Sequence, residues 1–241
     1  MNYTLEICAG SLASVSAAAD GGADRIELCD NLSEGGTTPS YGMIKTCISL
    51  FNIPVFPIIR PRGGDFVYSR NEFEVMKQDV ACCAESGCPG VVFGILKADG
   101  SIDTERCEEL MALAGTMQVT FHRAFDRCND LLQGLEDVID LGFSRILTSG
   151  GEASAEDGIP LLAKLIKKAR KRIIIMPGSG ITTANLPRII EETGAIEFHS
   201  TAKSKMTEAP VDMIQNSVGD QYPYQTDIEK VKLMRQILRA I

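Results

Sequence analysis

Short apolar runs alternate along this chain with longer amphipathic stretches. Four of the runs lie a few residues after a glycine, in residues 22–28, 87–93, 142–147 and 194–198. A glycine just past a helix adopts the left-handed capping conformation at little cost, and a strand can then begin. Each of these four segments therefore predicts a helix-to-strand junction.

Four further apolar runs, at residues 4–8, 55–60, 117–122 and 172–177, bring the predicted strands to eight. Helical periodicity fills the gaps and predicts helices over residues 11–20, 40–51, 72–86, 104–114, 131–141, 155–171, 183–192 and 227–239. Eight strand–helix units without a linker predict an α/β fold, a (β/α)8 TIM barrel in one domain over residues 1–241. An open doubly wound sheet is the alternative. The segment 206–224, rich in turn-forming and polar residues, carries no clear pattern.

The polar positions of the strands share one face. In the first strand Glu6 and Cys8 alternate with Leu5 and Ile7, and the second and eighth strands alternate in the same way. Helices cover the outer face of a barrel strand, so the polar face should turn inward. The side chains predicted to converge inside the barrel are Glu6, Glu27, Arg60, His122, Glu197 and His199. A buried ion network without a catalytic role is the alternative for the carboxylates, because interior charges need partners.

Both histidines stand where a strand ends. His122 closes the run 119–122 and His199 closes the run 196–199, while Cys29 and Arg60 end two other strands. In a parallel barrel the pocket lies at the C-terminal ends of the strands. Glutamate and histidine can act there as general acid or base once burial and neighbouring charges tune them. The candidate catalytic residues are Glu6, Glu27, Arg60, His122 and His199.

The loops that follow the strands carry candidate binding groups. Arg60 and Arg62, on a loop stiffened by proline, could grip a carboxylate or phosphate through paired hydrogen bonds. Glycine-bearing loops after the sixth and seventh strands could offer backbone N–H groups to a phosphate. The candidate substrate-binding residues are Arg62, Asp65, Arg123, Gly150, Gly151, Gly178, Ser179 and Gly180. Plain solvated turns are the alternative for these loops.

Composition narrows the range of partners. Hydrophobic residues make up 44% of the chain and charged residues 23%, as expected of a soluble globular protein. The net charge of -8 disfavours nucleic acid and anionic membranes as partners. The N-terminus shows no signal peptide, and no apolar run approaches the ~20 residues of a membrane helix. We therefore expect a cytoplasmic protein whose eight cysteines are thiols.

Two of these cysteines are candidate metal ligands. Cys8 and Cys29 end neighbouring strands with the same phase, so their sulfurs could approach each other. Two thiolates suit a soft ion such as Cu(I). Inert packing is the alternative, because buried cysteines usually behave as small apolar residues. The Cys-x-x-Cys spacing of zinc ribbons and thioredoxins does not occur, which disfavours both.

Two stretches are highly specific: Arg-Pro-Arg-Gly-Gly-Asp-Phe at residues 60–66 and Thr-Phe-His-Arg-Ala-Phe-Asp at residues 120–126. With residues 5–8, 22–29, 34–40 and 146–151, they make most of the chain similar to the CutC family, which is named for copper homeostasis. The resemblance implies a barrel, a cytoplasmic location, self-association as a dimer or tetramer, and a role in copper tolerance through Cu(I) binding. Cys8 and Cys29 match positions where the family often carries cysteine.

Two functional hypotheses follow. In the first, the protein acts in copper homeostasis and holds Cu(I) between Cys8 and Cys29. In the second, it is an enzyme that acts on a small anionic, for example phosphorylated, metabolite. Glu27 or His122 would then be the general acid or base, and the loop that begins at Arg60 would hold the anion.

Overall fold

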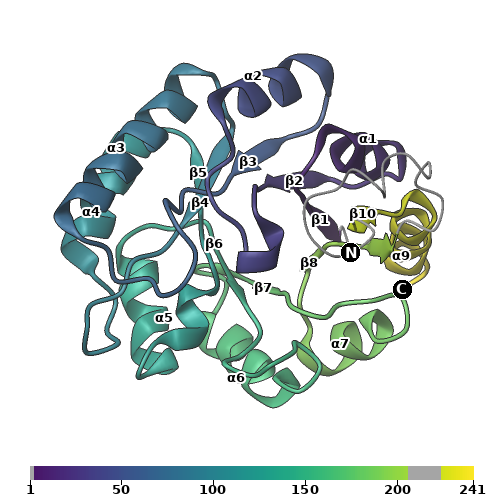
Figure 1. The fold of residues 1–241 in the computed structure, drawn as a ribbon. Helices are drawn as coiled ribbons and strands as arrows, with labels where there is room; N and C mark the ends of the chain where they lie inside the picture. Colours follow the sequence, from purple (N-terminus) through teal and green to yellow (C-terminus); the bar gives the residue numbers. More distant parts are fainter. Residues whose placement is uncertain (1–2, 206–223) are drawn as a thin grey trace.

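The computed structural model describes residues 3–205 and 224–241, in which parallel strands are surrounded by helices. Figure 1 shows the strands at the centre and the helices in a ring outside them. All eight strands predicted from the apolar runs are present. They are β1 (Thr4–Ala9), β2 (Arg25–Leu28), β3 (Val55–Pro57), β4 (Gly90–Phe93), β5 (Gln118–Phe121), β6 (Arg145–Thr148), β7 (Ile174–Pro177) and β8 (Glu197–Ser200).

The helices follow in the predicted order: α1 (Leu12–Asp20), α2 (Tyr41–Leu50), α3 (Arg70–Glu85), α4 (Thr104–Ala114), α5 (Leu131–Asp140), α6 (Ile159–Ala169), α7 (Leu186–Thr193) and α9 (Ile228–Ala240). Two of them, α6 and α7, begin later than predicted. Each has a proline in its first turn, Pro160 and Pro187, where a missing N–H leaves no hydrogen bond unmade. Helix α3 begins earlier than predicted, because Ser69 and Glu72 form a capping box.

Two four-stranded parallel sheets make up the strand layer, in the orders β3-β2-β1-β8 and β4-β5-β6-β7. The chain continuing β3 joins them, since the Ile59 N–H donates to the Val92 carbonyl at 2.7 Å. At the other seam, a methyl group on Gly178 after β7 would stand 3.3 Å from the His199 Cβ of β8. The first strand also pairs with the last. This is a TIM-barrel-like α/β fold, which confirms the predicted fold class.

An antiparallel pair, β9 (Lys203–Lys205) and β10 (Tyr224–Thr226), follows β8 and was not expected from the apolar pattern. It leads into α9, whose N-terminus is capped by the Asp227 side chain. Figure 1 places β10 and α9 beside α1, close to the N-terminus. Of the segment 206–224, for which the sequence carries no clear pattern, residues 206–223 lie outside the described residues.

The two faces of β1 show why the strands alternate. Leu5 and Ile7 are fully buried in the apolar core, while Glu6 and Cys8 lie on the opposite face. Burial of the apolar face supplies the main driving force for folding, because it removes hydrocarbon from water. The helices of the described ranges include none that is both long and apolar enough to cross a bilayer.

Charged side chains inside the strand layer form one ion network. Arg25 Nε lies 2.5 Å from Glu6 Oε2, and Arg25 Nη2 lies 2.5 Å from Glu197 Oε2. Arg145 Nε lies 3.1 Å from the same Glu197 oxygen. The Phe56 ring lies 5.2 Å from one guanidinium and 5.4 Å from the other. Two carboxylates therefore neutralise two guanidinium groups, which makes their burial tolerable.

We predict that Glu197→Gln lowers the free energy of unfolding by about 3–5 kcal/mol, because it leaves two buried guanidinium groups with one carboxylate. Urea denaturation followed by circular dichroism measures this loss. Glu136→Gln is the matched control, since Glu136 pairs with Arg172 at the surface and should matter much less. Equal losses in the two variants would contradict the prediction.

Candidate functional site

A cavity of about 860 Å³ opens at the C-terminal ends of the strands. Among its lining residues are Cys8, Glu27, Arg60, His122 and His199, which come from five different strands or the residues just after them. All five are buried. The structure therefore brings together four of the five candidate catalytic residues and one candidate metal ligand.

Glu6, the fifth candidate catalytic residue, lies directly behind His199. The two residues are partners in the β1–β8 register, and His199 Nδ1 lies 2.7 Å from Glu6 Oε1. The other oxygen of Glu6 faces Arg25. Although burial favours the neutral acid, Arg25 and His199 hold the pKa of Glu6 at about 2. Glu6 is therefore a fixed negative charge that orients the imidazole.

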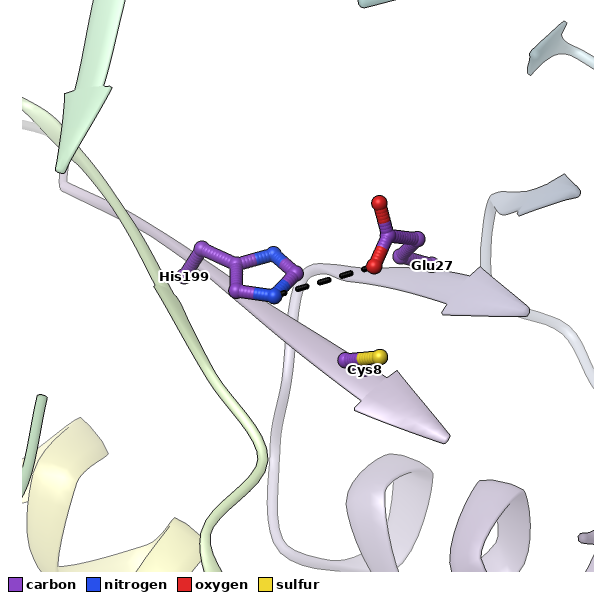
Figure 2. A group of neighbouring side chains, drawn as sticks. All are labelled: Cys8, Glu27 and His199. Carbon is purple, nitrogen blue, oxygen red and sulfur yellow. Dashed lines mark ion pairs between the residues drawn. The ribbon is translucent and has the colours of Figure 1, made fainter. Parts of the chain in front are cut away.

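The other face of the His199 imidazole is turned toward the cavity. His199 Nε2 lies 3.7 Å from Glu27 Oε2. The dashed line in Figure 2 marks this pair. Burial opposes protonation of His199, but the negative charges of Glu27, Cys8 and Glu6 outweigh it and raise its pKa well above 6.5. Burial also raises the pKa of Glu27 well above 4.5, and the charge on Cys8 acts in the same direction.

The two predicted sulfur ligands are in contact. Cys8 Sγ and Cys29 Sγ are 3.4 Å apart, because β1 and β2 are adjacent and both residues lie at strand ends. The hydrogen bond with Cys29 lowers the pKa of Cys8 to about 5, against the effect of burial. The same bond raises the pKa of Cys29 well above 9. The pair therefore holds one thiolate and one thiol, which share a proton.

A possible ligand set extends beyond this pair. The sulfur of Cys8, a carboxylate oxygen of Glu27 and a ring nitrogen of His199 all lie within 4.8 Å of one another. Figure 2 shows the three side chains converging from β1, β2 and β8. From the sequence, Glu27 and His199 were assigned to catalysis and only the cysteines to metal. Glu27, His199 and the cysteines all lie at or near the ends of neighbouring strands, on the same face of those strands. This shared position could have indicated from the sequence that the predicted catalytic and metal-binding residues form one cluster.

Arg60 and His122 occupy another part of the cavity wall. The Arg60 guanidinium donates to the carbonyl oxygens of Glu34, Gly36 and Gly64 at 2.7–2.8 Å. The ring of Phe66 lies 4.9 Å from the Arg60 guanidinium and 4.9 Å from the His122 ring. Arg60 therefore ties two loops together, and three of its four terminal N–H groups are engaged by loop carbonyls rather than open to an anion as the sequence analysis expected.

His122 is a neutral imidazole. Its Nδ1 accepts a hydrogen bond from the Ala124 N–H at 3.2 Å, so the ring proton sits on Nε2. Burial lowers the pKa of His122 to about 3, and the charge of Arg60 adds to the effect. Its Nε2 has no hydrogen-bond partner among the described residues. His122 is thus set up to donate a hydrogen bond rather than to carry charge.

Several predicted substrate-binding residues are already engaged by local partners. Arg62 and Asp65 bind each other on an outer loop, where Arg62 also pairs with Glu72. The N–H groups of Gly150 and Gly151 donate to side chains of Thr148 and Asp126. Local partners therefore occupy these four substrate-binding candidates, and the structure does not present them as open binding groups.

The remaining candidates lie at or near the cavity. Arg123, Ser179 and Gly180 line it, although Arg123 is paired with Asp126 at 2.8 Å. Gly178 packs against His199, and its N–H donates to the Thr148 carbonyl. Sequence reasoning missed the part of the wall formed by β9, β10 and α9, which includes Lys203, Tyr224 and Lys230. No local sequence motif marks these residues, because only the pairing of β9 with β10 brings them to the cavity wall.

Comparison with known proteins identifies the family. A sequence model of the CutC family matches residues 3–204. The chain belongs to the CutC family. A CutC family protein of Chromobacterium violaceum is 48% identical over an alignment of 244 positions, which covers 99% of each chain. The copper homeostasis protein cutC homolog of Homo sapiens is 47% identical over 246 residues, covering 99% of this chain and 90% of that protein.

The fold agrees with this assignment. A crystal structure of CutC from Streptococcus agalactiae superposes with a TM-score of 0.79 at 37% identity. The superposition covers 83% of this chain and 98% of that one. The resemblance to the CutC family drawn from residues 60–66 and 120–126 is confirmed.

We predict that neither histidine of this CutC-family chain titrates between pH 5 and pH 8. His122 should stay neutral, because its pKa is held at about 3, and His199 should stay protonated, because its pKa is raised well above 6.5. The chain has two histidines, so ¹⁵N-histidine NMR gives two separable ring systems. A midpoint near 6.5 for either ring would contradict the described electrostatics.

Proposed function

We propose that this CutC-family protein acts in copper homeostasis by binding Cu(I) through Cys8 and Cys29. The observation that carries the proposal is the 3.4 Å approach of the two buried sulfurs, a separation at which one ion can contact both. The name of the human relative, a copper homeostasis protein, supports the same function.

The chemistry of the donor set favours a soft ion. Thiolate ligands select Cu(I) over hard cations, which prefer carboxylate oxygens and water. One thiolate is available at neutral pH, since the pKa of Cys8 is about 5. Burial raises the pKa of Glu27 well above 4.5, because the charged carboxylate is poorly solvated there, and this makes the site unfavourable for a hard cation.

His199 is the third candidate ligand. Histidines that bind metals usually donate their second ring N–H to a carboxylate, which fixes the ring and exposes the other nitrogen. Glu6 holds His199 Nδ1 in this way, and Nε2 then faces Glu27 and the neighbouring Cys8. The Arg25 contact keeps Glu6 charged, so the ion network below the site supports the orientation of the imidazole.

The setting of this function is inferred from chemistry and from the family. All eight cysteines are free, which is consistent with a cytoplasmic location, because thiols persist in a reducing compartment. We infer that the protein is a homo-oligomer, a dimer or tetramer, as the family resemblance implies. We also infer that a single domain over residues 1–241 carries the function.

We predict that Cys8→Ser/Cys29→Ser weakens Cu(I) binding by more than the roughly 10–100-fold that follows loss of an outer-shell partner. The reason is that serine removes both soft donors with little change in volume. An anaerobic competition with a chromophoric Cu(I) chelator measures the affinity. Cys82→Ser/Cys128→Ser is the matched control, because these two thiols lie outside the site and should leave the affinity intact. Unchanged affinity in the Cys8/Cys29 variant would rule out the proposal.

We predict that Cu(I) affinity rises with pH between 6 and 8, because Cys29, whose pKa is raised well above 9, must lose its proton to bind. One released proton corresponds to about a tenfold gain per pH unit, since Cys8 is already a thiolate. Coordination by His199 would release a second proton and steepen the dependence to about a hundredfold per unit.

The variant His199→Gln distinguishes these cases. It should reduce a second-order dependence on proton concentration to first order and leave a first-order dependence unchanged. An affinity independent of pH in the native protein would contradict binding by both sulfurs.

A further inference from the structure

The cavity has a second end that the sulfur site does not use. Arg60 Nε and His122 Nε2 are buried nitrogens that each carry a proton and have no hydrogen-bond partner among the described residues. Buried N–H groups in folded proteins are almost always paired, so each such group calls for an explanation. Both side chains line the same cavity and both lie against one ring, since the Phe66 ring centre is 4.9 Å from the Arg60 guanidinium carbon and 4.9 Å from the centre of the His122 ring.

The charge of Arg60 is also uncompensated. The residue is 4% exposed, and its guanidinium donates hydrogen bonds to backbone carbonyl oxygens of Glu34, Gly36 and Gly64. Within the described ranges no carboxylate forms an ion pair with it. A buried cation without a counter-charge is costly, and a bound anion would remove that cost.

Two lysines add positive charge to the cavity wall. Lys203 and Lys230 line the cavity, and neither forms an ion pair in the described part of the chain. Glu27 is the one carboxylate among the described lining residues. The chain as a whole carries a net charge of -8, so this cavity is a local exception to its surface charge. Such a cleft concentrates small anions from solution.

We propose that this end of the cavity binds a small organic oxyanion, with Arg60 Nε and His122 Nε2 donating hydrogen bonds to one carboxylate or phosphate group. This site goes beyond copper binding and does not depend on it. A cavity of about 860 Å³ matches the size of a small-molecule site. The loop carbonyls hold the guanidinium in place, so little ordering is needed when the anion binds.

Phe66 gives the proposed anion site an apolar wall, which a patch of charged residues on the surface would lack. Its ring lines the cavity and lies against both donors, so an anion that reaches them must contact or displace it. Phe66 stands on the same loop as Gly64, whose φ of +83° is a conformation that suits glycine. The bound molecule therefore meets an apolar face beside its charged group, which favours an organic anion over a bare inorganic one.

The native protein provides the first test. In ¹⁵N-histidine NMR, titration with succinate and separately with inorganic phosphate should move the His122 Nε2–H resonance along a saturable curve. Chloride at equal ionic strength should not. Saturation with succinate identifies carboxylate, and saturation with phosphate identifies phosphate. A His122 resonance that neither probe moves, or that chloride moves equally, overturns the proposal.

A matched pair of variants provides the second test. Arg60→Gln and Arg62→Gln each remove one positive charge from the same loop, but only Arg60 lines the cavity. Arg60→Gln should weaken the saturating probe at least about tenfold, the usual loss for one charge-assisted hydrogen bond. Arg62→Gln should leave its affinity within about twofold by the same reasoning. Equal weakening would show general charge attraction and overturn the proposal.

Two further variants keep the test decisive. If Arg60→Gln fails to fold, His122→Phe replaces it, because phenylalanine keeps a ring packed on Phe66 and removes the donor. Isothermal titration calorimetry then measures the probe, and native affinity in that variant overturns the proposal. The Cys8→Ser/Cys29→Ser protein should lose Cu(I) binding and still bind the probe. Failure of the anion site and failure of the copper site are therefore seen separately.

Discussion

Glu6 is the residue on which the rest of the site depends. Its two oxygens face different partners, Arg25 on one side and His199 on the other. Because Arg25 also reaches Glu197, a single carboxylate connects the ion network inside the strand layer to the imidazole at the cavity. The network is costly to bury unless every member is paired, so it fixes the register of β1, β2 and β8 together.

The cavity above this network has two chemically distinct ends. At one end, Cys8 and Cys29 form a hydrogen-bonded pair of one thiolate and one thiol, and His199 carries a positive charge beside them. At the other end His122 is held neutral near Arg60. The two histidines stand at equivalent strand ends, yet opposite surroundings keep one protonated and the other neutral.

Much of the fold follows from local sequence features. Glycine followed by an apolar run marked four of the eight strands correctly, because a left-handed helix cap and a buried strand are both local signals. The alternation of Glu6 with Leu5 likewise predicted which face turns inward. The start of α6 was misplaced because the position of Pro160 in the first turn outweighed helical periodicity.

The site was harder to predict, because the partner of a side chain depends on residues far away in the chain. Arg62 resembled Arg60 in sequence, but Glu72 engages Arg62 outside the cavity, whereas Arg60 points inward. The wall contributed by β10 comes from antiparallel pairing with β9, for which neither segment carries a strong apolar alternation.

The pairing of the first strand with the last has a consequence for how the protein is made. Cys8 and Cys29 are separated by 21 residues and can meet while the ribosome is still adding later strands. Glu6 and His199 are separated by 193 residues. Glu6 therefore has no imidazole partner until most of the chain has left the ribosome. The oriented imidazole therefore requires β8, and a product truncated before β8 would carry the two thiols without it.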